Sequence, residues 1–134
     1  MAVSQKNGMN NSKNQRDPWI YDGKPEYVDL NVAAMSASEG GYVVAMELAS
    51  GAVRIAATRQ PAKYAASWSG IVKRFGVPRI VRIMVSKPFL RYEKVKRVIT
   101  NAMSEYRDRE VDSYHLSIDT MTAKAKEVFD TAGP

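Results

Sequence analysis

The chain has 134 residues, of which 45% are hydrophobic and 25% charged, and its formal net charge is +6. This composition is that of an ordinary globular domain, and no apolar run reaches the ~20 residues that a membrane-spanning helix needs. Cysteine is absent and His115 is the single histidine, which excludes disulfides, thiolate zinc sites and histidine-rich metal clusters. The N-terminus lacks the apolar stretch of a secretory signal, so we expect a cytoplasmic protein with no membrane partner.

The first forty residues carry few signals of regular structure. Residues 1–18 are rich in Asn, Ser, Gln, Lys and Gly, and we expect them to be disordered. Scattered aromatic residues in 19–40 predict an irregular arm that is pinned to the domain, with a short helix near 29–37. The chain is therefore divided into a flexible N-terminal tail, an irregular arm and one α/β domain, at 1–26, 27–40 and 41–134.

A β-hairpin opens the predicted domain. Residues 41–48 are rich in strand-forming side chains, and a turn at Ala49-Ser50-Gly51 leads into a second strand over 52–58. The alternation along the second strand separates its two faces. Val53, Ile55 and Ala57 lie on one face, and Arg54 and Ala56 lie on the other.

A helix is predicted next, because apolar residues recur at spacings of four, three, four and three. Pro61 suits its first turn, while Gly76 and Pro78 end it. Its buried stripe consists of Pro61, Ala65, Trp68, Val72 and Phe75.

A third strand and a longer helix follow. Residues 79–85 alternate as a strand should, and the helix begins at Lys87-Pro88 and runs to about Tyr106. Its buried stripe consists of Tyr92, Val95, Val98, Ile99, Ala102 and Tyr106.

The C-terminal part is read as a short strand over 112–118 and a last helix over 120–130, capped by Asp119 or Ser117. Met121, Ala125 and Val128 share the buried face of that helix. The predicted fold class is therefore α+β, with a small, mostly antiparallel sheet flanked by helices in the order ββαβα and then βα.

Positive charge is concentrated in the middle of the chain. Residues 54–97 hold twelve basic residues and one acid, a net charge of +11, whereas 1–39 sum to −1 and 110–134 to −3. Such a one-sided field attracts a polyanion, and nucleic acid is the commonest one in a cell. We expect DNA to be bound through phosphate contacts, with a solvated basic face as the plainer alternative. The predicted contacts are Arg54, Arg59, Lys63, Lys73, Arg74, Arg82, Arg91, Lys94, Lys96 and Arg97.

Some of these side chains also have a purely structural interpretation. Arg54 and Arg82 are predicted on the less apolar face of neighbouring strands, where Glu47 is a candidate partner for one of them. They either contact phosphate or cover the sheet with their aliphatic stems. Tyr64 and Tyr114 either line a groove or pack at the edge of the core.

Five short segments resemble the GIY-YIG endonuclease family, in particular its small phage-type branch. The resemblance covers about 41–130 and rests on the order and spacing of the segments more than on the motifs. The matching segments are Gly41-Tyr42-Val43, Val53-Arg54-Ile55-Ala56, Thr58-Arg59-Gln60-Pro61, Glu93 to Met103, and Ser113-Tyr114-His115-Leu116.

The resemblance implies a chemistry as well as a fold. In that family a tyrosine of the hairpin, an arginine of the first helix and a glutamate of the second cleave a phosphodiester with one divalent metal. The corresponding residues of this chain are Tyr42, Lys63 and Glu93. An active member would therefore bind Mg²⁺ or Mn²⁺ through Glu93, and otherwise no cofactor is expected.

Departures from the family pattern indicate a degenerate site. Val53 and Ala56 replace an aromatic residue and a glycine of the second motif, and Lys63 replaces an arginine, without its forked geometry. Lys96 stands at or near the metal position, where it would repel a cation. Glu93 is then a solvated acid that pairs with its neighbours along the helix.

Three functions stay open at this point. The first is a nucleic-acid-binding protein on a GIY-YIG-like scaffold, without strong nuclease activity. The second is an active metal-dependent endonuclease. The third is an interaction or inhibitor protein, of the kind that phages and other mobile elements encode, which docks its basic face on an acidic partner.

Overall fold

The structure is a computed structural model that describes residues 19–28, 40–110 and 112–132. Its centre is a four-stranded antiparallel sheet with the strand order β1-β4-β2-β3. This arrangement confirms the α+β class and the antiparallel sheet expected from the sequence. The strands are β1 (Trp19–Gly23), β2 (Tyr42–Leu48), β3 (Val53–Thr58) and β4 (Ile80–Ser86).

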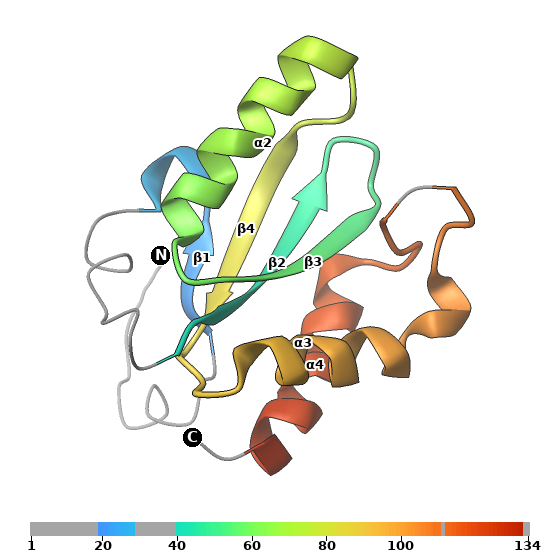
Figure 1. Cartoon of the computed structure of the whole chain (residues 1–134). Coiled ribbons are helices and arrows are strands. Elements are labelled where there is room, and N and C mark those ends of the chain that lie inside the picture. The colour runs from blue at the N-terminus through green and yellow to red at the C-terminus, as the bar shows by residue number, and fades with distance from the viewer. Residues whose placement is uncertain (1–18, 29–39, 111, 133–134) are drawn as a thin grey trace, which may run out of the picture.

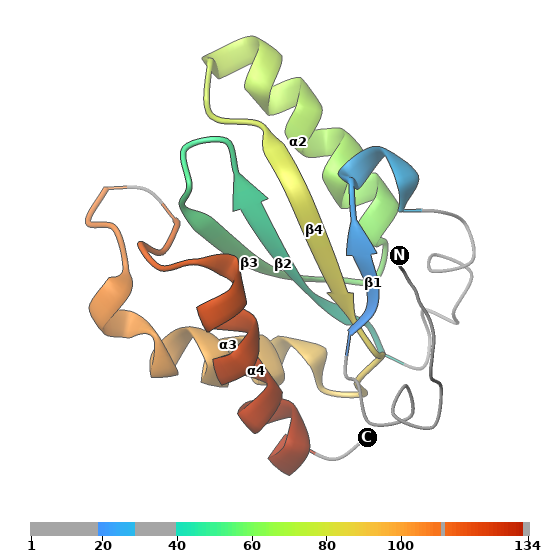
Figure 2. The same ribbon diagram turned by 180° about the vertical axis from the view of Figure 1, so that it is seen from behind.

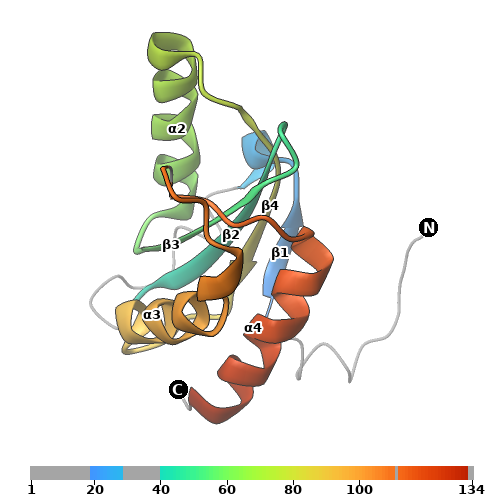
Figure 3. The same cartoon turned by 90° about the vertical axis from the view of Figure 1, so that its right-hand side faces the viewer.

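Helices cover both faces of the sheet. One face carries α2 (Pro61–Phe75), and the other carries α3 (Tyr92–Ala102) and α4 (Ile118–Ala132), as Figures 1 and 2 show from opposite sides. Figure 3 shows the sheet edge-on between these two layers. Two 3-10 turns complete the described elements, η2 (Pro25–Tyr27) and η4 (Ser104–Tyr106).

The alternation of strand side chains divides the core into two halves. Val43 and Ala45 of β2 pack towards α3 and α4, whereas Val44 and Met46 pack towards α2. Because β2 lies between β3 and β4, its residues from Tyr42 to Met46 are buried on both faces. This explains why β2 reads as an almost continuous apolar run.

The predicted hairpin between β2 and β3 is confirmed. Leu48 N–H donates to Ala52 O at 2.9 Å, and Gly51 N–H donates to Leu48 O at 2.8 Å. Gly51 has a φ of 93°, a left-handed value that glycine adopts without steric cost. The predicted end of the first helix is confirmed too, because Gly76 caps α2 with a φ of 68°.

Strand β1 is the main element that the sequence analysis missed. Residues 19–26 were assigned to the flexible tail, yet Trp19–Gly23 pairs with β4, with Tyr21 opposite Val85. A five-residue strand in which Ile20 is exposed has too weak an alternation of apolar and polar residues to be recognised. Its partner residues in β4 lie at least sixty positions away in the chain. The predicted disorder of 1–18 and the short helix near 29–37 fall outside the described residues.

The strand predicted over 112–118 is wrong. Tyr114 makes isolated bridges to Val53 and Arg107, and no strand forms around it. The last helix begins at Ile118 rather than 120, and its predicted cap is confirmed, since Thr120 N–H donates to Ser117 Oγ at 3.1 Å.

The helix predicted from Lys87 begins later, at Tyr92. Phe89 forms a two-way backbone bridge with Gly41, in which the N–H···O distances are 2.8 and 3.1 Å. This pairing keeps the chain extended before α3. The helix also ends earlier, at Ala102, and the turn η4 takes up the remaining residues to Tyr106.

Three residues predicted in buried stripes, Phe75, Val98 and Ala102, are exposed instead. Phe75 is 67% exposed, because the C-terminal end of α2 extends beyond the sheet (Figures 1 and 3). Val98 is 43% exposed, while Val95, Ile99 and Met103 form the buried side of α3 and of the turn after it. Helical periodicity alone cannot say how far the covering sheet extends.

A pair of glycine substitutions tests the local backbone. Gly40 has a φ of 125°, and a Cβ there would collide with the carbonyl of Phe89, so Gly40→Ala should destabilise the fold by about 1–3 kcal/mol. Gly70 lies inside α2 with open space around it, so Gly70→Ala should stabilise by up to about 1 kcal/mol. Chemical denaturation of both variants measures the change in the free energy of unfolding. Changes of the same sign and size in the two variants would contradict this account.

Candidate functional site

An open polar cleft of 540 Å³ lies beside β3, the strand at one edge of the sheet. Ile55 and Ala56 line it although they are only 2% and 7% exposed, so their contribution comes mainly from the backbone. The side chains around the cleft come from β3, α2, α3 and the segment before α4. The polar ones are Arg54, Tyr64, Glu93, Lys96, Arg97, Thr100 and Asp112.

Arg54 holds the floor of this cleft together. Its guanidinium donates to the Tyr64 hydroxyl and to the backbone oxygen of Asp112, both at 3.0 Å, and stacks over Trp68 at 4.5 Å. The Asp112 carboxylate lies 3.8 Å from the same guanidinium. Arg54 Nε is buried and has no hydrogen-bond partner among the described residues. Arg54 therefore ties three parts of the chain together, and its side chain keeps only 17% exposure.

A second hollow, of 310 Å³, continues from the cleft around the loop between β3 and α2. Arg59 and Lys63 line it, and Tyr64 lines both hollows. Arg59 Nε donates to the Tyr92 hydroxyl at 3.2 Å, which joins this loop to the first turn of α3. We call the resulting row of cations the β3-edge strip; it consists of Arg54, Arg59, Lys63, Lys96 and Arg97.

Arg82 does not belong to the strip, which corrects the prediction that it shares a face with Arg54. β2 separates β3 from β4, and Arg82 points to the α4 side of the sheet, whereas Arg54 points to the α2 side. The Arg82 guanidinium donates two hydrogen bonds to the Asp22 carboxylate, at 2.8 and 2.9 Å. The Asp119 carboxylate lies 3.3 Å from the same guanidinium. These interactions, chiefly the hydrogen bonds to Asp22, raise the pKa of the Arg82 guanidinium above its usual value.

The acids that neutralise Arg82 are also not the predicted one. Glu47 lies opposite Arg82 in the register of β2 and β4, but the ion pairs of Arg82 are with Asp22 and Asp119. A cation with two carboxylates in contact has little charge left for a phosphate. We therefore remove Arg82 from the set of candidate contacts.

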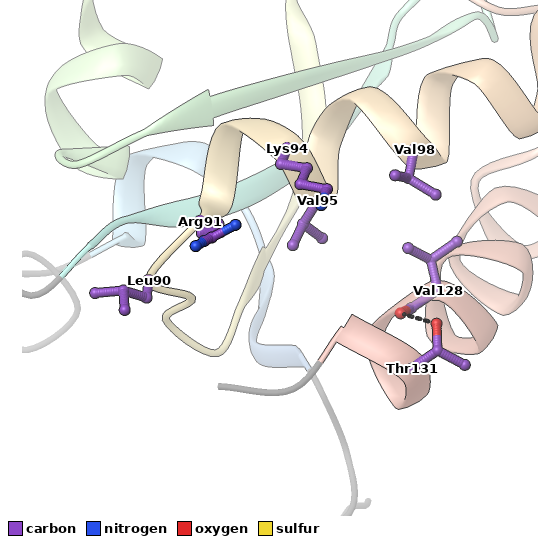
Figure 4. A pocket seen from close by; sticks show the side chains of 7 residues that line it. All are labelled: Leu90, Arg91, Lys94, Val95, Val98, Val128 and Thr131. Carbon is purple, nitrogen blue, oxygen red and sulfur yellow. Dashed lines mark hydrogen bonds between the residues drawn. The ribbon is translucent and has the colours of Figure 1, made fainter.

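The other four predicted cations lie away from the strip. Lys73 lines a separate hollow beside Trp68 and Pro25, and Arg74 stacks on Phe75 with 5.9 Å between guanidinium and ring. Arg91 and Lys94 line a groove on the opposite flank of α3, towards α4 (Figure 4). The structure thus gathers half of the ten predicted contacts on one surface.

Comparison with known proteins gives no match, whether against family models, curated proteins or solved structures. No helix in the described part of the chain is long and apolar enough to cross a membrane.

The three predicted catalytic residues do not converge. Tyr42 is 2% exposed and packs in the core half beneath α2, and this burial raises the pKa of its phenol. Glu93 lines the polar cleft, and Lys63 lines the adjoining hollow. The tyrosine that reaches both hollows is Tyr64 instead. Within the described residues, no group of three or more histidine, cysteine or acidic side chains could hold a metal ion.

Sequence reasoning missed Asp112 and Tyr92 as neighbours of the site. Tyr92, Lys96 and Thr100 follow each other at four-residue spacing on α3, so the helical repeat could have shown that they share a flank. No periodicity or motif in the sequence indicates that Asp112 lies near Arg54. It reaches Arg54 because the segment before α4 bridges to Val53 through Tyr114, with N–H···O distances of 2.7 and 3.0 Å.

Proposed function

We propose that this protein binds nucleic acid by contacting phosphates through the β3-edge strip. One observation carries the proposal: cations from β3, from the loop and first turn of α2, and from α3 lie along one edge of the sheet. These cations come from two stretches of the sequence, 54–63 and 96–97. A surface that gathers positive charge in this way attracts a polyanionic backbone.

The charges of the strip are largely available for an external anion. Among the described residues, Arg59, Lys63, Lys96 and Arg97 make no ion pair within 4 Å, and only Arg54 has a nearby carboxylate. Glu93 and Asp112 line the same cleft, which leaves five cations against two acids. Phosphate contacts of this kind supply affinity and orientation, and they do not read sequence.

We further propose a GIY-YIG-like scaffold without strong cleavage. The fold has the hairpin, the basic helix and the second helix that the resemblance requires. However, Tyr42 is only 2% exposed in the core beneath α2 and lines neither hollow, whereas Glu93 lines the polar cleft. A tyrosine enclosed in the core in this way cannot act on a phosphodiester bound in the cleft.

Fluorescence anisotropy with a labelled DNA duplex over a series of salt concentrations tests the proposed binding. The logarithm of the association constant should fall linearly with the logarithm of salt concentration, by about 0.9 for each phosphate contacted. The four cations that make no ion pair with a described residue predict a slope of roughly −3 to −4. A single-stranded probe should give about 0.7 for each contact. Binding that is indifferent to salt would remove the proposal.

Incubation of supercoiled plasmid with the protein and Mg²⁺ or Mn²⁺ separates binding from cleavage. We expect the plasmid to stay intact under conditions in which the anisotropy assay shows it bound. Nicking that disappears in a Glu93→Gln variant would instead establish the endonuclease alternative, and it would require Tyr64 rather than Tyr42 as the tyrosine of the site.

A further inference from the structure

A groove of 380 Å³ runs between α3 and α4, on the flank of α3 that faces away from the β3-edge strip. Figure 4 shows its two walls, with Leu90, Val95 and Val98 on the α3 side and Val128 and Thr131 on the α4 side. The groove opens where the first turn of α3 faces the last turns of α4. Its floor is apolar, in contrast to the polar cleft on the opposite flank.

Two large apolar side chains of this groove are exposed to solvent. Leu90 is 65% exposed and Val98 is 43% exposed, although both lie on or next to a well-packed helix. Lys94 and Val98 are four residues apart on α3 and therefore share a flank of the helix, while Leu90 lines the groove from the turn just before α3. Exposed apolar residues that line a concave surface are typical of an interaction site.

The charge around the groove is positive. Arg91 and Lys94 line it, and neither makes an ion pair with a described residue. No acidic side chain is among the described residues that line the groove. The groove therefore combines apolar side chains with two cations that pair with no described acid. A partner that fits this groove carries an apolar stripe with acidic side chains next to it.

We propose that this groove binds an acidic amphipathic helix of a partner protein. A partner helix can place apolar residues at i, i+3 or i+4, and i+7 in the groove between α3 and α4, because the side-chain ridges of one helix pack into the grooves between others. Glutamate or aspartate residues beside that apolar stripe would pair with Arg91 and Lys94. This inference does not depend on nucleic-acid binding, since the two surfaces lie on opposite flanks of α3.

The probe for this proposal is a designed, fluorescently labelled helical peptide with leucines at i, i+4 and i+7 flanked by glutamates. A control peptide keeps the leucines and replaces each glutamate with lysine. We expect the acidic peptide to bind the full chain at least tenfold more tightly than the basic one. Equal binding of the two peptides would overturn the proposal, because charge would then play no part.

Protein variants locate the bound peptide. Lys94→Glu and Val98→Ser should each weaken binding of the acidic peptide about tenfold or more. Lys96→Glu is the matched control, since it makes the same charge change on the same helix but lines the polar cleft on the opposite flank. None of the three side chains is buried, so the variants should keep their thermal unfolding midpoints. If Lys96→Glu weakens peptide binding as much as Lys94→Glu does, the peptide follows net charge and the groove assignment fails.

Discussion

The double variant Lys96→Glu, Arg97→Glu is expected to bind DNA at least tenfold more weakly than the unmodified chain at about 0.1 M salt. Both residues line the polar cleft beside β3, and each substitution replaces an attraction for phosphate with a repulsion. Loss of two phosphate contacts should also lower the salt slope by about 1.8 on duplex DNA. Anisotropy titrations at several salt concentrations measure both effects.

The matched control is Lys73→Glu, Arg74→Glu. This pair also consists of a lysine followed by an arginine on a helix, so the change in net charge is identical. Lys73 and Arg74 lie near the end of α2, away from the strip. We expect the control to change affinity less than threefold. Equal losses in the two double variants would show that net charge, and not the strip, governs binding.

Truncation of a single phenylalanine should have the largest effect on stability. Phe129 is 2% exposed, and its ring packs against Trp19 and Phe89 with centroid distances of 5.1 and 5.0 Å. These contacts join α4 to β1 and to the segment before α3. Phe129→Ala removes the shared ring and leaves a cavity, so it should cost about 3–5 kcal/mol of unfolding free energy. That is a large part of the roughly 5–15 kcal/mol by which natural domains are stable.

Phe75→Ala is the control for this experiment. Phe75 is also a helical phenylalanine, but it is 67% exposed at the end of α2 that extends beyond the sheet. Its truncation should change the unfolding free energy by no more than about 0.5 kcal/mol. Urea denaturation of both variants gives the comparison. If Phe75→Ala costs as much as Phe129→Ala, then Phe75 is buried, as the helical periodicity alone had indicated.

The sequence predicted most of the elements whose signals are local. The hairpin, the helix that begins at Pro61 and the strand at 79–85 were recognisable from alternation, spacing and turn residues. The segment from Trp19 to Gly23 was not, because a strand of five residues is stabilised by pairing with β4 and packing against α4, and neither appears in its own pattern. Tyr114 was misread for the converse reason, since its strand-like pattern forms only two isolated bridges, to Val53 and Arg107, and no strand.

The sequence predicted which charged residues are candidates for the site, but it could not predict which of them share a surface. Helical spacing showed that Lys96 and Arg97 lie outside the buried stripe of α3. Whether they lie near Arg54 depends on which edge of the sheet β3 occupies. Arg82 is an example of a cation that the fold places elsewhere. Arg82 comes from the same charged block, yet β4 places it on the other side of the sheet, against Asp22 and Asp119.

The amino-acid sequence alone determined the class of the fold, the strong positive charge of residues 54–97, and the lack of cysteine chemistry. These properties follow from composition and from contacts between near neighbours in the chain. Only the tertiary structure decided which cations share a surface, which are neutralised, and that Tyr42 is buried on the side of the sheet opposite α3. The physical reason is that strand order and the length of the covering helices are set by long-range packing, in which each residue depends on partners far away in sequence.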